Sequence, residues 1–392
     1  MATAAPHDSR RRAALFVTTV PVTLEAFLVP FADHFRALGW RVDALANGAA
    51  AVPQLEAHFG ARFDVAWSRS PLAPSNLLGA AQRVREIVTA GGYDIVHLHT
   101  PIAAFVTRYA LRNLPSASRP VVIYTCHGFH FYRGQGRPGH AFFRTMERIA
   151  APWTDYLVTV NREDFEAARG LGGIAADRVR LIPGIGVDTR RFSPDAVTGN
   201  EAAAVRRGLQ VPKDAFMLTM VAELAPVKRH MHVLRALARV RNDSVTLVLV
   251  GDGPSASLVR ERVAALGLTD RVRWAGYRRD LPAVLAASDT LILASEREGL
   301  NRSVLEAMAS GRPVIGTDTR GIVDAVGADA GWIVAKNDVD ALAEAIDAAA
   351  AGPSEVARRG AAARVRACAE FALDGIIDAY DGLYREALAS RV

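Results

Sequence analysis

Short apolar runs alternate with helix-like segments along nearly the whole chain, and this alternation limits the possible folds most. The predicted strands are residues 13–20, 42–46, 95–98, 121–124, 156–160 and 179–182, and then 215–221, 246–250, 272–274, 290–293, 313–316 and 331–334. Strands separated by helices form parallel sheets that helices cover on both faces. The sequence therefore predicts the α/β class in two similar halves.

The length sets the number of domains. The chain has 392 residues, half of them hydrophobic, and at about 150 residues per domain two domains are expected. The periodic pattern loosens between Asp188 and Asp214, where a linker fits. We predict an N-terminal Rossmann-like domain over residues 1–190, a linker over 191–213, a C-terminal Rossmann-like domain over 214–375 and a last helix over 376–392.

The segment from Ser295 to Thr317 carries most of the functional information. It reads SEREGLNRSVLEAMASGRPVIGT, which is a loop after a strand, a helix that stops at Gly311, and another strand. In a parallel sheet, the loops after the strands form the ligand crevice, and helix N-termini there suit a phosphate. The loop residues Gly299, Leu300 and Asn301 are therefore a candidate diphosphate site.

Two carboxylates lie in this segment, Glu298 in the loop and Glu306 about one turn into the helix, with seven residues between them. A carboxylate beside a diphosphate can accept hydrogen bonds from a ribose diol, and we assign that role to Glu306. Glu298, nearer the strand, would meet a sugar hydroxyl. The alternative is that both side chains are solvated, as charged residues on exposed helix faces commonly are.

The string EGLNRSVLEAMASGRPV resembles the E-x7-E signature of the retaining glycosyltransferases of family 4. The resemblance covers nearly the whole chain. It implies the GT-B architecture, two Rossmann-like domains facing across a cleft, with residues 376–392 returning to the N-terminal domain. It also implies retaining sugar transfer from a nucleoside diphosphate sugar, for which we expect UDP, with no metal, no other cofactor and no enzyme nucleophile.

Lys228 follows the predicted strand 215–221, in VAELAPVKRH. A lysine there can stabilise the charge that develops on a departing diphosphate. The family resemblance implies a basic pair at this place, an arginine and this lysine. Here Glu223 occupies the usual arginine position, so either Arg229 supplies the second charge or the site works with one. The alternative for Lys228 alone is a solvated loop lysine.

Two further loops of the second half resemble donor-binding segments. Gly251 and Gly253 follow a strand in VLVGDGP but do not complete G-x-G-x-x-G, and the resemblance implies close approach of backbone to nucleotide. Tyr277 and Arg278 end the segment WAGYR, which in the family holds the base.

In the first half, YTCHGFHFYRG places His127 at the end of a strand. It resembles the family's active-site histidine, which approaches the donor sugar. The segment HGFHFYRG most resembles the sequences of capsule and exopolysaccharide transferases, which act on polyprenyl-diphosphate-linked acceptors. His97 and His99 end the preceding strand, and we expect them on the acceptor side. Structural histidines are the alternative.

Other function classes find little support. Asp338 and Asp340 form an Asp-x-Asp pair, but they open a helix, where aspartate caps the first turn, so we predict a cap and no metal site. The net charge of +6 suggests an acidic partner. The basic residues of the chain are scattered along the sequence, which argues against nucleic acid as the partner. Cys126 and Cys368 are too few for a disulfide framework.

The expected location is the cytoplasm, with peripheral binding to the inner face of the membrane. No run of about 18 apolar residues is present, and the first apolar run reads as a strand rather than a signal peptide. A lipid-linked acceptor would bring the protein to a membrane surface through basic residues of the first half. The candidates are Arg83, Arg85, Arg108 and Arg112, with Arg133, Arg137 and Arg144 in a glycine-rich loop beside Phe142 and Phe143. A solvated basic face is the alternative.

Three alternatives to lipid-linked transfer stay open at this point. A nucleotide-sugar epimerase of the same architecture would turn over its substrate without an acceptor. A transferase with a soluble acceptor would not need a membrane. A nucleotide-binding module would bind without consuming the ligand, and the glutamate at position 223 keeps this option open.

Overall fold

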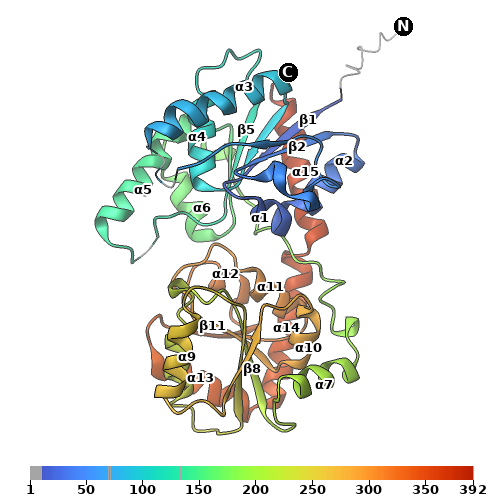
Figure 1. The fold of residues 1–392 in the computed structure, drawn as a ribbon, viewed down its shortest axis with the longest axis vertical. Helices are drawn as coiled ribbons and strands as arrows, with labels where there is room; N and C mark the ends of the chain where they lie inside the picture. The colour runs from blue at the N-terminus through green and yellow to red at the C-terminus, as the bar shows by residue number, and fades with distance from the viewer. Residues whose placement is uncertain (1–10, 69, 71, 133, 392) are drawn as a thin grey trace. The chain divides into compact units, whose positions relative to one another are not determined.

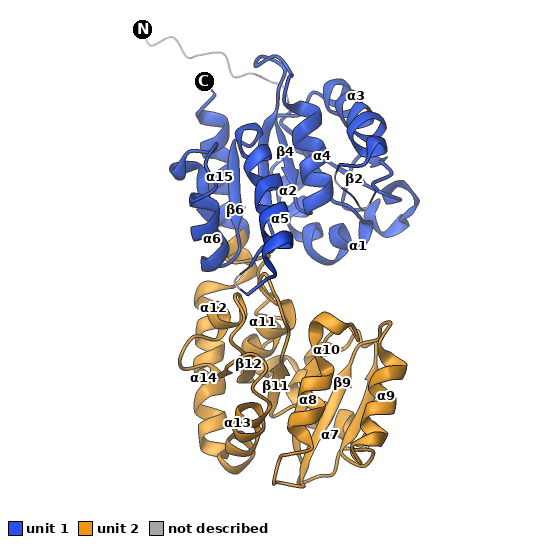
Figure 2. Cartoon of the chain, turned by 90° about the vertical axis from the view of Figure 1, so that its left-hand side faces the viewer, with its two compact units in different colours: residues 1–182, 377–392 blue, residues 183–376 orange. Residues whose placement is uncertain are grey.

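The computed structural model describes residues 11–68, 70, 72–132 and 134–391. The chain divides into two compact units (Figures 1 and 2). Unit 1 comprises residues 1–182 and 377–392, and unit 2 comprises residues 183–376. Residues 191–213, predicted as a linker, belong to unit 2 and contain the helix α7, Gly199–Gly208.

Unit 1 contains a parallel sheet in the order β3-β2-β1-β4-β5-β6-β7. Its strands are β1 Ala13–Val17, β2 Arg41–Ala46, β3 Arg62–Asp64, β4 Ile95–Leu98, β5 Val121–Cys126, β6 Tyr156–Thr159 and β7 Val179–Leu181. β1, β4, β5 and β6 are buried along their whole length. This explains their continuous apolar runs, because helices cover both faces.

The helices of unit 1 are α1 Pro21–Thr23, α2 Val29–Ala37, α3 Ala81–Gly91, α4 Pro101–Leu111, α5 Arg137–Ala150 and α6 Arg162–Arg169. The last helix, α15, spans Leu373–Ala389, and its residues from Ile377 onward belong to this unit. There Tyr384 stacks on Phe35 of α2 with ring centroids 4.4 Å apart. The end of the chain is thus packed into the first sheet's helical layer.

Unit 2 repeats the same topology with the order β10-β9-β8-β11-β12-β13. Its strands are β8 Phe216–Val221, β9 Val245–Val250, β10 Val272–Gly276, β11 Thr290–Leu293, β12 Val314–Thr317 and β13 Gly331–Val334. The order is the 3-2-1-4-5-6 arrangement of Rossmann folds, in which ligands bind where the strand order reverses. In unit 2 that point lies between β8 and β11.

The helices of unit 2 after α7 are α8 His230–Leu237, α9 Ala256–Ala265, α10 Leu281–Ala287, α11 Arg302–Ala309, α12 Ile322–Val326, α13 Val339–Ala351 and α14 Pro353–Glu370. A continuous apolar core runs from Leu218 of β8 to Ala367 of α14. α11 packs into it with Val304, Leu305 and Met308, each at most 1% exposed. The helix behind the candidate loop is therefore fixed by the core.

One predicted loop is wrong. Arg137, Phe142, Phe143 and Arg144 lie on α5 rather than in a glycine-rich loop. Pro138 occupies the first turn of this helix, where its fixed backbone is tolerated. Arg133, which the prediction grouped with them, lies outside the described residues.

Candidate functional site

The switch point of unit 2 brings two loops together, one after β8 and one after β11. The backbone N–H of Glu296 donates to the carbonyl of Val227 at 2.9 Å, and Nζ of Lys228 donates to Oε1 of Glu298 at 2.6 Å. The sequence predicted both charged side chains for the site on separate grounds. The structure places them in direct contact at the edge where a Rossmann fold binds its ligand.

The Lys228–Glu298 pair is partly shielded from water. The side chains are 19% and 10% exposed, so their attraction is stronger than that of a solvated surface pair. Arg229 has left-handed backbone geometry, with φ of 55°, and its guanidinium contacts Glu296 at 3.2 Å and Asn337. Arg229 is thus already engaged in an ion pair, and Lys228 supplies the cation beside Glu298.

The loop between β11 and α11 is held from behind by the loop after β12. Thr319 Oγ1 donates to the carbonyl of Ser295 at 2.8 Å, and Nε of Arg320 donates to the carbonyl of Glu298 at 3.1 Å. A Cβ atom at position 321 would overlap the carbonyl oxygen of Gly299, which requires Gly321. These residues were not predictable, because no motif in the sequence connects them to the loop.

The helix α11 positions Glu306. Asn301, predicted for the donor site, caps the helix by accepting from Val304 N at 3.2 Å. Glu306 is 3% exposed, and its Oε1 accepts from Nε of Arg302 at 2.7 Å. Burial raises the pKa of Glu306 above its ordinary value, and Arg302 opposes this shift. The solvated-glutamate alternative is wrong for Glu306, because the fold has buried the carboxylate and given it a cation.

The two glycines after β9 have a packing role that the structure makes visible. A Cβ at Gly251 would overlap the carbonyl oxygen of Ala222, and one at Gly253 would lie 2.7 Å from that of Leu224. The glycines allow the loop after β9 to contact the loop after β8, so chain packing alone requires them.

The segment predicted to hold the base lies at the surface. Tyr277 is 76% exposed, which leaves its ring available to a ligand. Nε of Arg278 donates to Asp280 at 2.7 Å, so this guanidinium is already paired with a carboxylate.

In unit 1, His97 is a structural residue. It is 3% exposed, and its Nδ1 and Nε2 lie 2.6 Å from the hydroxyl of Tyr384 and 2.8 Å from that of Thr125. Burial lowers the pKa of His97 to about 3. Both ring nitrogens are used inside the protein, so its geometry does not fit the predicted acceptor contact.

His99 and His127 lie at the ends of β4 and β5, and the ring of His99 is also 4.0 Å from that of His97, centroid to centroid. Nδ1 of His99 lies 3.3 Å from Nε2 of His127, and Nε2 of His99 is buried without a hydrogen bond. Burial lowers the pKa of His127 to about 4, although part of the side chain reaches the surface, and burial also lowers the pKa of His99 well below its ordinary value. Both imidazoles are therefore neutral at pH 7 and suited to hydrogen bonding rather than to charge stabilisation.

Comparison with known proteins agrees with this geometry. Residues 24–191 match the family model described as Glycosyltransferase Family 4, and residues 202–366 match that of Glycosyl transferases group 1. The putative glycosyltransferase EpsD of Bacillus subtilis is 32% identical over 339 residues, which cover 85% of this chain and 86% of that protein. The chain belongs to glycosyltransferase family 4.

Other relatives of this family 4 glycosyltransferase differ in what their names state. An Escherichia coli galactosyltransferase, whose name gives UDP-galactose as donor and GlcNAc-diphosphoundecaprenol as acceptor, is 28% identical, and 65% of each chain is covered. Anabaena HepE, solved with UDP and glucose, superposes with a TM-score of 0.80 at 21% identity, covering 96% of this chain and all of that one. The latter likeness shows the GT-B fold.

Within the described parts of this glycosyltransferase, no group of three or more His, Cys, Asp or Glu side chains is placed to hold a metal ion. Asp338 accepts from the backbone N–H of Ala341 and caps α13, which confirms the predicted cap. Asp340 lies 2.7 Å from Arg239. The Asp-x-Asp pair is thus part of a helix start.

The basic face predicted on unit 1 needs correction. Arg108 is 1% exposed and pairs with Glu147 at 2.9 Å, so it is a core residue. Arg83 pairs with Glu86 at 3.4 Å. Arg137, Arg144 and Arg148 remain exposed on α5. Among the described residues, no helix combines the length and apolar character that crossing a bilayer requires.

Proposed function

We propose that this glycosyltransferase transfers a sugar from a UDP-sugar to a hydroxyl of a lipid-linked, diphosphate-bearing acceptor, with retention of configuration and without a metal ion. The observation that carries the proposal is the arrangement of three charged side chains at the switch point of unit 2. Glu298 lies in the loop after β11, the buried Glu306 lies on the helix that follows this loop, and Lys228 lies in the neighbouring loop after β8. A UDP complex of a structural neighbour and the named donor and acceptor of the E. coli relative support the choice of substrates.

Each side chain has a defined task in this proposal. Lys228 stabilises the negative charge that develops on the diphosphate as the bond from the sugar C1 breaks. Glu298, held by Lys228, accepts a hydrogen bond from a sugar hydroxyl. Glu306 accepts from the ribose diol through Oε2, since Arg302 bonds Oε1. The fixed loop means that these groups need little reorganisation during the reaction.

The transfer needs no enzyme nucleophile. The acceptor oxygen attacks C1 on the face that the diphosphate leaves, and the departing phosphate oxygen takes the acceptor proton. The C1–O bond to UDP breaks, the bond from C1 to the acceptor oxygen forms, and UDP is released. The protein contributes positioning and electrostatic stabilisation.

One experiment tests the reaction type. The purified protein is incubated with UDP-glucose, UDP-galactose or UDP-GlcNAc, with and without a synthetic prenyl-diphosphate-linked sugar, and UDP release and product anomeric configuration are measured. We expect acceptor-dependent UDP release and a retained anomer. An isomerised nucleotide sugar in the absence of an acceptor would indicate an epimerase. Transfer only to free sugars would indicate that the acceptor is soluble. Binding without turnover would indicate a nucleotide-binding module.

A chelator tests the metal requirement in the same assay. Activity should persist in excess EDTA, because Lys228 supplies the charge that a divalent cation would otherwise provide. Loss of activity that magnesium or manganese restores would contradict this part of the proposal.

A further inference from the structure

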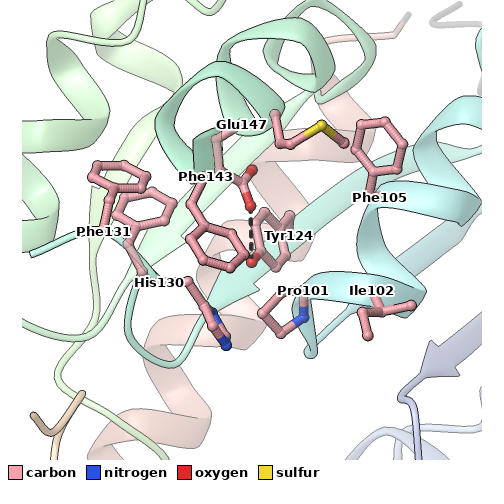
Figure 3. A pocket seen from close by; sticks show the side chains of 10 residues that line it. Pro101, Ile102, Phe105, Tyr124, His130, Phe131, Phe143 and Glu147 are labelled. Atoms are coloured by element: carbon pink, nitrogen blue, oxygen red, sulfur yellow. Dashed lines mark hydrogen bonds between the residues drawn. The ribbon is translucent and has the colours of Figure 1, made fainter. Parts of the chain in front are cut away.

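Unit 1 contains an apolar cavity of about 160 Å³ between α4 and α5, beside the end of β5 (Figure 3). Its wall consists mostly of aromatic and aliphatic side chains. The lining residues that matter here are Ile102, Phe105, Phe129, Phe131, Phe143 and Met146. Phe129 and Phe131 are stacked with ring centroids 4.5 Å apart. The packed core of unit 1 thus leaves a space with flat aromatic walls.

Two polar side chains that line this cavity, Glu147 and Tyr124, already have partners. The carboxylate of Glu147 pairs with the buried Arg108 at 2.9 Å, and it accepts a hydrogen bond from the hydroxyl of Tyr124 at 3.5 Å (Figure 3). The guanidinium of Arg108 also lies over the Tyr124 ring, 4.4 Å from its centroid. An apolar ligand would therefore not have to desolvate an unpaired charge at this wall.

The size of the cavity suits a short hydrocarbon segment. Apolar cavities of about 150 Å³ in proteins stay dry and bind molecules the size of benzene. The cavity also lies at the carboxyl edge of the sheet, since Pro101 and Ile102 follow β4 and Phe129 follows β5. His99 and His127 stand at the same strand ends, so one edge carries both polar and apolar binding groups.

The outer face of α5 has a different character from the inner face that lines the cavity. Phe142 and Ile149 are 43% and 48% exposed, one heptad apart, and the exposed Arg137, Arg144 and Arg148 flank them. The helix thus presents apolar groups inward and a mixture of arginines and apolar side chains outward. Such a face fits an anionic surface into which aromatic side chains insert.

We propose that this cavity binds the first isoprene units of a prenyl diphosphate, the lipid part of the acceptor. The inference rests on the proposed lipid-linked acceptor and goes beyond it by naming the subsite. Planar, methyl-branched isoprene units match the stacked aromatic wall, and the exposed arginines on the outer face of α5 complement the negative charge of an anionic leaflet that carries such a lipid.

Binding of farnesyl diphosphate to the full-length protein, measured by calorimetry, tests the site without turnover. Inorganic diphosphate reports the head group alone, and dodecyl phosphate reports an unbranched chain. We expect farnesyl diphosphate to bind at least about tenfold more tightly than inorganic diphosphate, because the cavity removes apolar surface from water. Equal affinities, or equal binding of dodecyl phosphate, would overturn the assignment.

Two substitutions to tryptophan locate the binding. Ile102→Trp fills the cavity, whereas Leu258→Trp adds bulk at an exposed position of α9 in unit 2. Ile102→Trp should weaken farnesyl diphosphate binding at least about tenfold, and Leu258→Trp should leave it unchanged. Retained binding in Ile102→Trp would overturn the proposal. UDP affinity and the melting temperature show whether both variants are folded, and comparison of geranyl with farnesyl diphosphate on the unmodified protein tests chain-length dependence if Ile102→Trp does not fold.

Failure of this site and failure of the proposed function can be told apart. Farnesyl diphosphate binding that Ile102→Trp removes supports the cavity site, even if no sugar transfer to a lipid-linked acceptor is detected. Transfer to such an acceptor with an unchanged KM in Ile102→Trp would support the proposed function and overturn the cavity site.

Discussion

The two units share one topology but carry opposite chemistry at their binding edges. In unit 2 the switch point holds two charged pairs, Lys228 with Glu298 between the loops and Arg302 with Glu306 on α11. In unit 1 the corresponding edge holds neutral imidazoles at His99 and His127 beside an aromatic cavity. The backbone arrangement therefore sets only the location of the ligand site, and the side chains at the strand ends determine which class of ligand fits there.

The difference follows from what each edge would have to stabilise. A nucleoside diphosphate brings several negative charges, so unit 2 needs preorganised cations and hydrogen-bond acceptors. A lipid-linked acceptor brings a hydroxyl and an apolar tail, which need neutral hydrogen-bonding groups and desolvated space.

The largest effect is expected from Lys228→Ala in unit 2. Loss of the cation that we propose to face the leaving diphosphate should lower kcat by about 10²–10³-fold, or about 2.7–4 kcal/mol of transition-state stabilisation. Steady-state kinetics with a saturating donor measure this. Lys213→Ala, at an exposed position of the same unit, should keep the wild-type kcat. An unchanged kcat in Lys228→Ala would remove the charge-stabilising role from this edge.

Glu306→Ala should weaken UDP binding by about 1.5–3 kcal/mol, the range for losing a charged hydrogen-bond acceptor. Calorimetric titration with UDP measures the effect. Glu344→Ala, an exposed glutamate on α13, is the control and should bind UDP normally. Wild-type affinity in Glu306→Ala would rule out the ribose contact and leave Arg302 as the partner that explains this buried carboxylate.

The positions of the two glutamates at the sheet edge could be predicted from the sequence, because the signal is local. Seven residues separate Glu298 from Glu306, and strand-loop-helix patterns place both at a sheet edge. The loop that supports Glu298 was not predictable in the same way. Arg320 lies 22 residues further along, and only the pairing of β11 with β12 brings its loop into contact.

Long-range partners also explain the errors in unit 1. Arg108 is of a residue type that usually lies at the surface, and its burial depends on Glu147, 39 residues away. His97 depends on Tyr384, 287 residues away, for its hydrogen bond. Contacts over such sequence separations produce no periodic pattern in the sequence. Residue type and position alone therefore suggested that Arg108 is exposed and that His97 contacts a ligand.

The neutral histidines of unit 1 predict how stability changes with pH. The pKa of His97 is about 3 in the folded protein and about 6.5 when unfolded, so the unfolded state takes up a proton first as the pH falls. This part of the stability is present above pH 6.5 and is lost toward pH 3, with a slope on the order of 1 kcal/mol per pH unit. Urea unfolding of wild type and His97→Gln between pH 7.5 and 4.5 should show a shallower decline in the variant, and parallel curves would contradict this.

The smallest effect per substituted residue is expected on the outer face of α5, where membrane binding would distinguish unit 1 from unit 2. Each exposed arginine near an anionic leaflet contributes about 1 kcal/mol of binding. Arg137, Arg144 and Arg148 changed together to Glu should therefore reduce cosedimentation with vesicles that contain anionic lipid. Salt should reduce binding of the wild type in the same way, because screening weakens exposed charges.

A matched change in unit 2 decides whether this binding belongs to one helix or to net charge. Arg235, Arg239 and Arg262 share the wall of a hollow in unit 2, and their change to Glu alters the total charge equally. If only the α5 variant loses vesicle binding, unit 1 contains the membrane-facing surface, next to the cavity proposed for the prenyl chain. If both variants lose it equally, the +6 net charge explains the attraction, and the distinct role given to α5 is wrong.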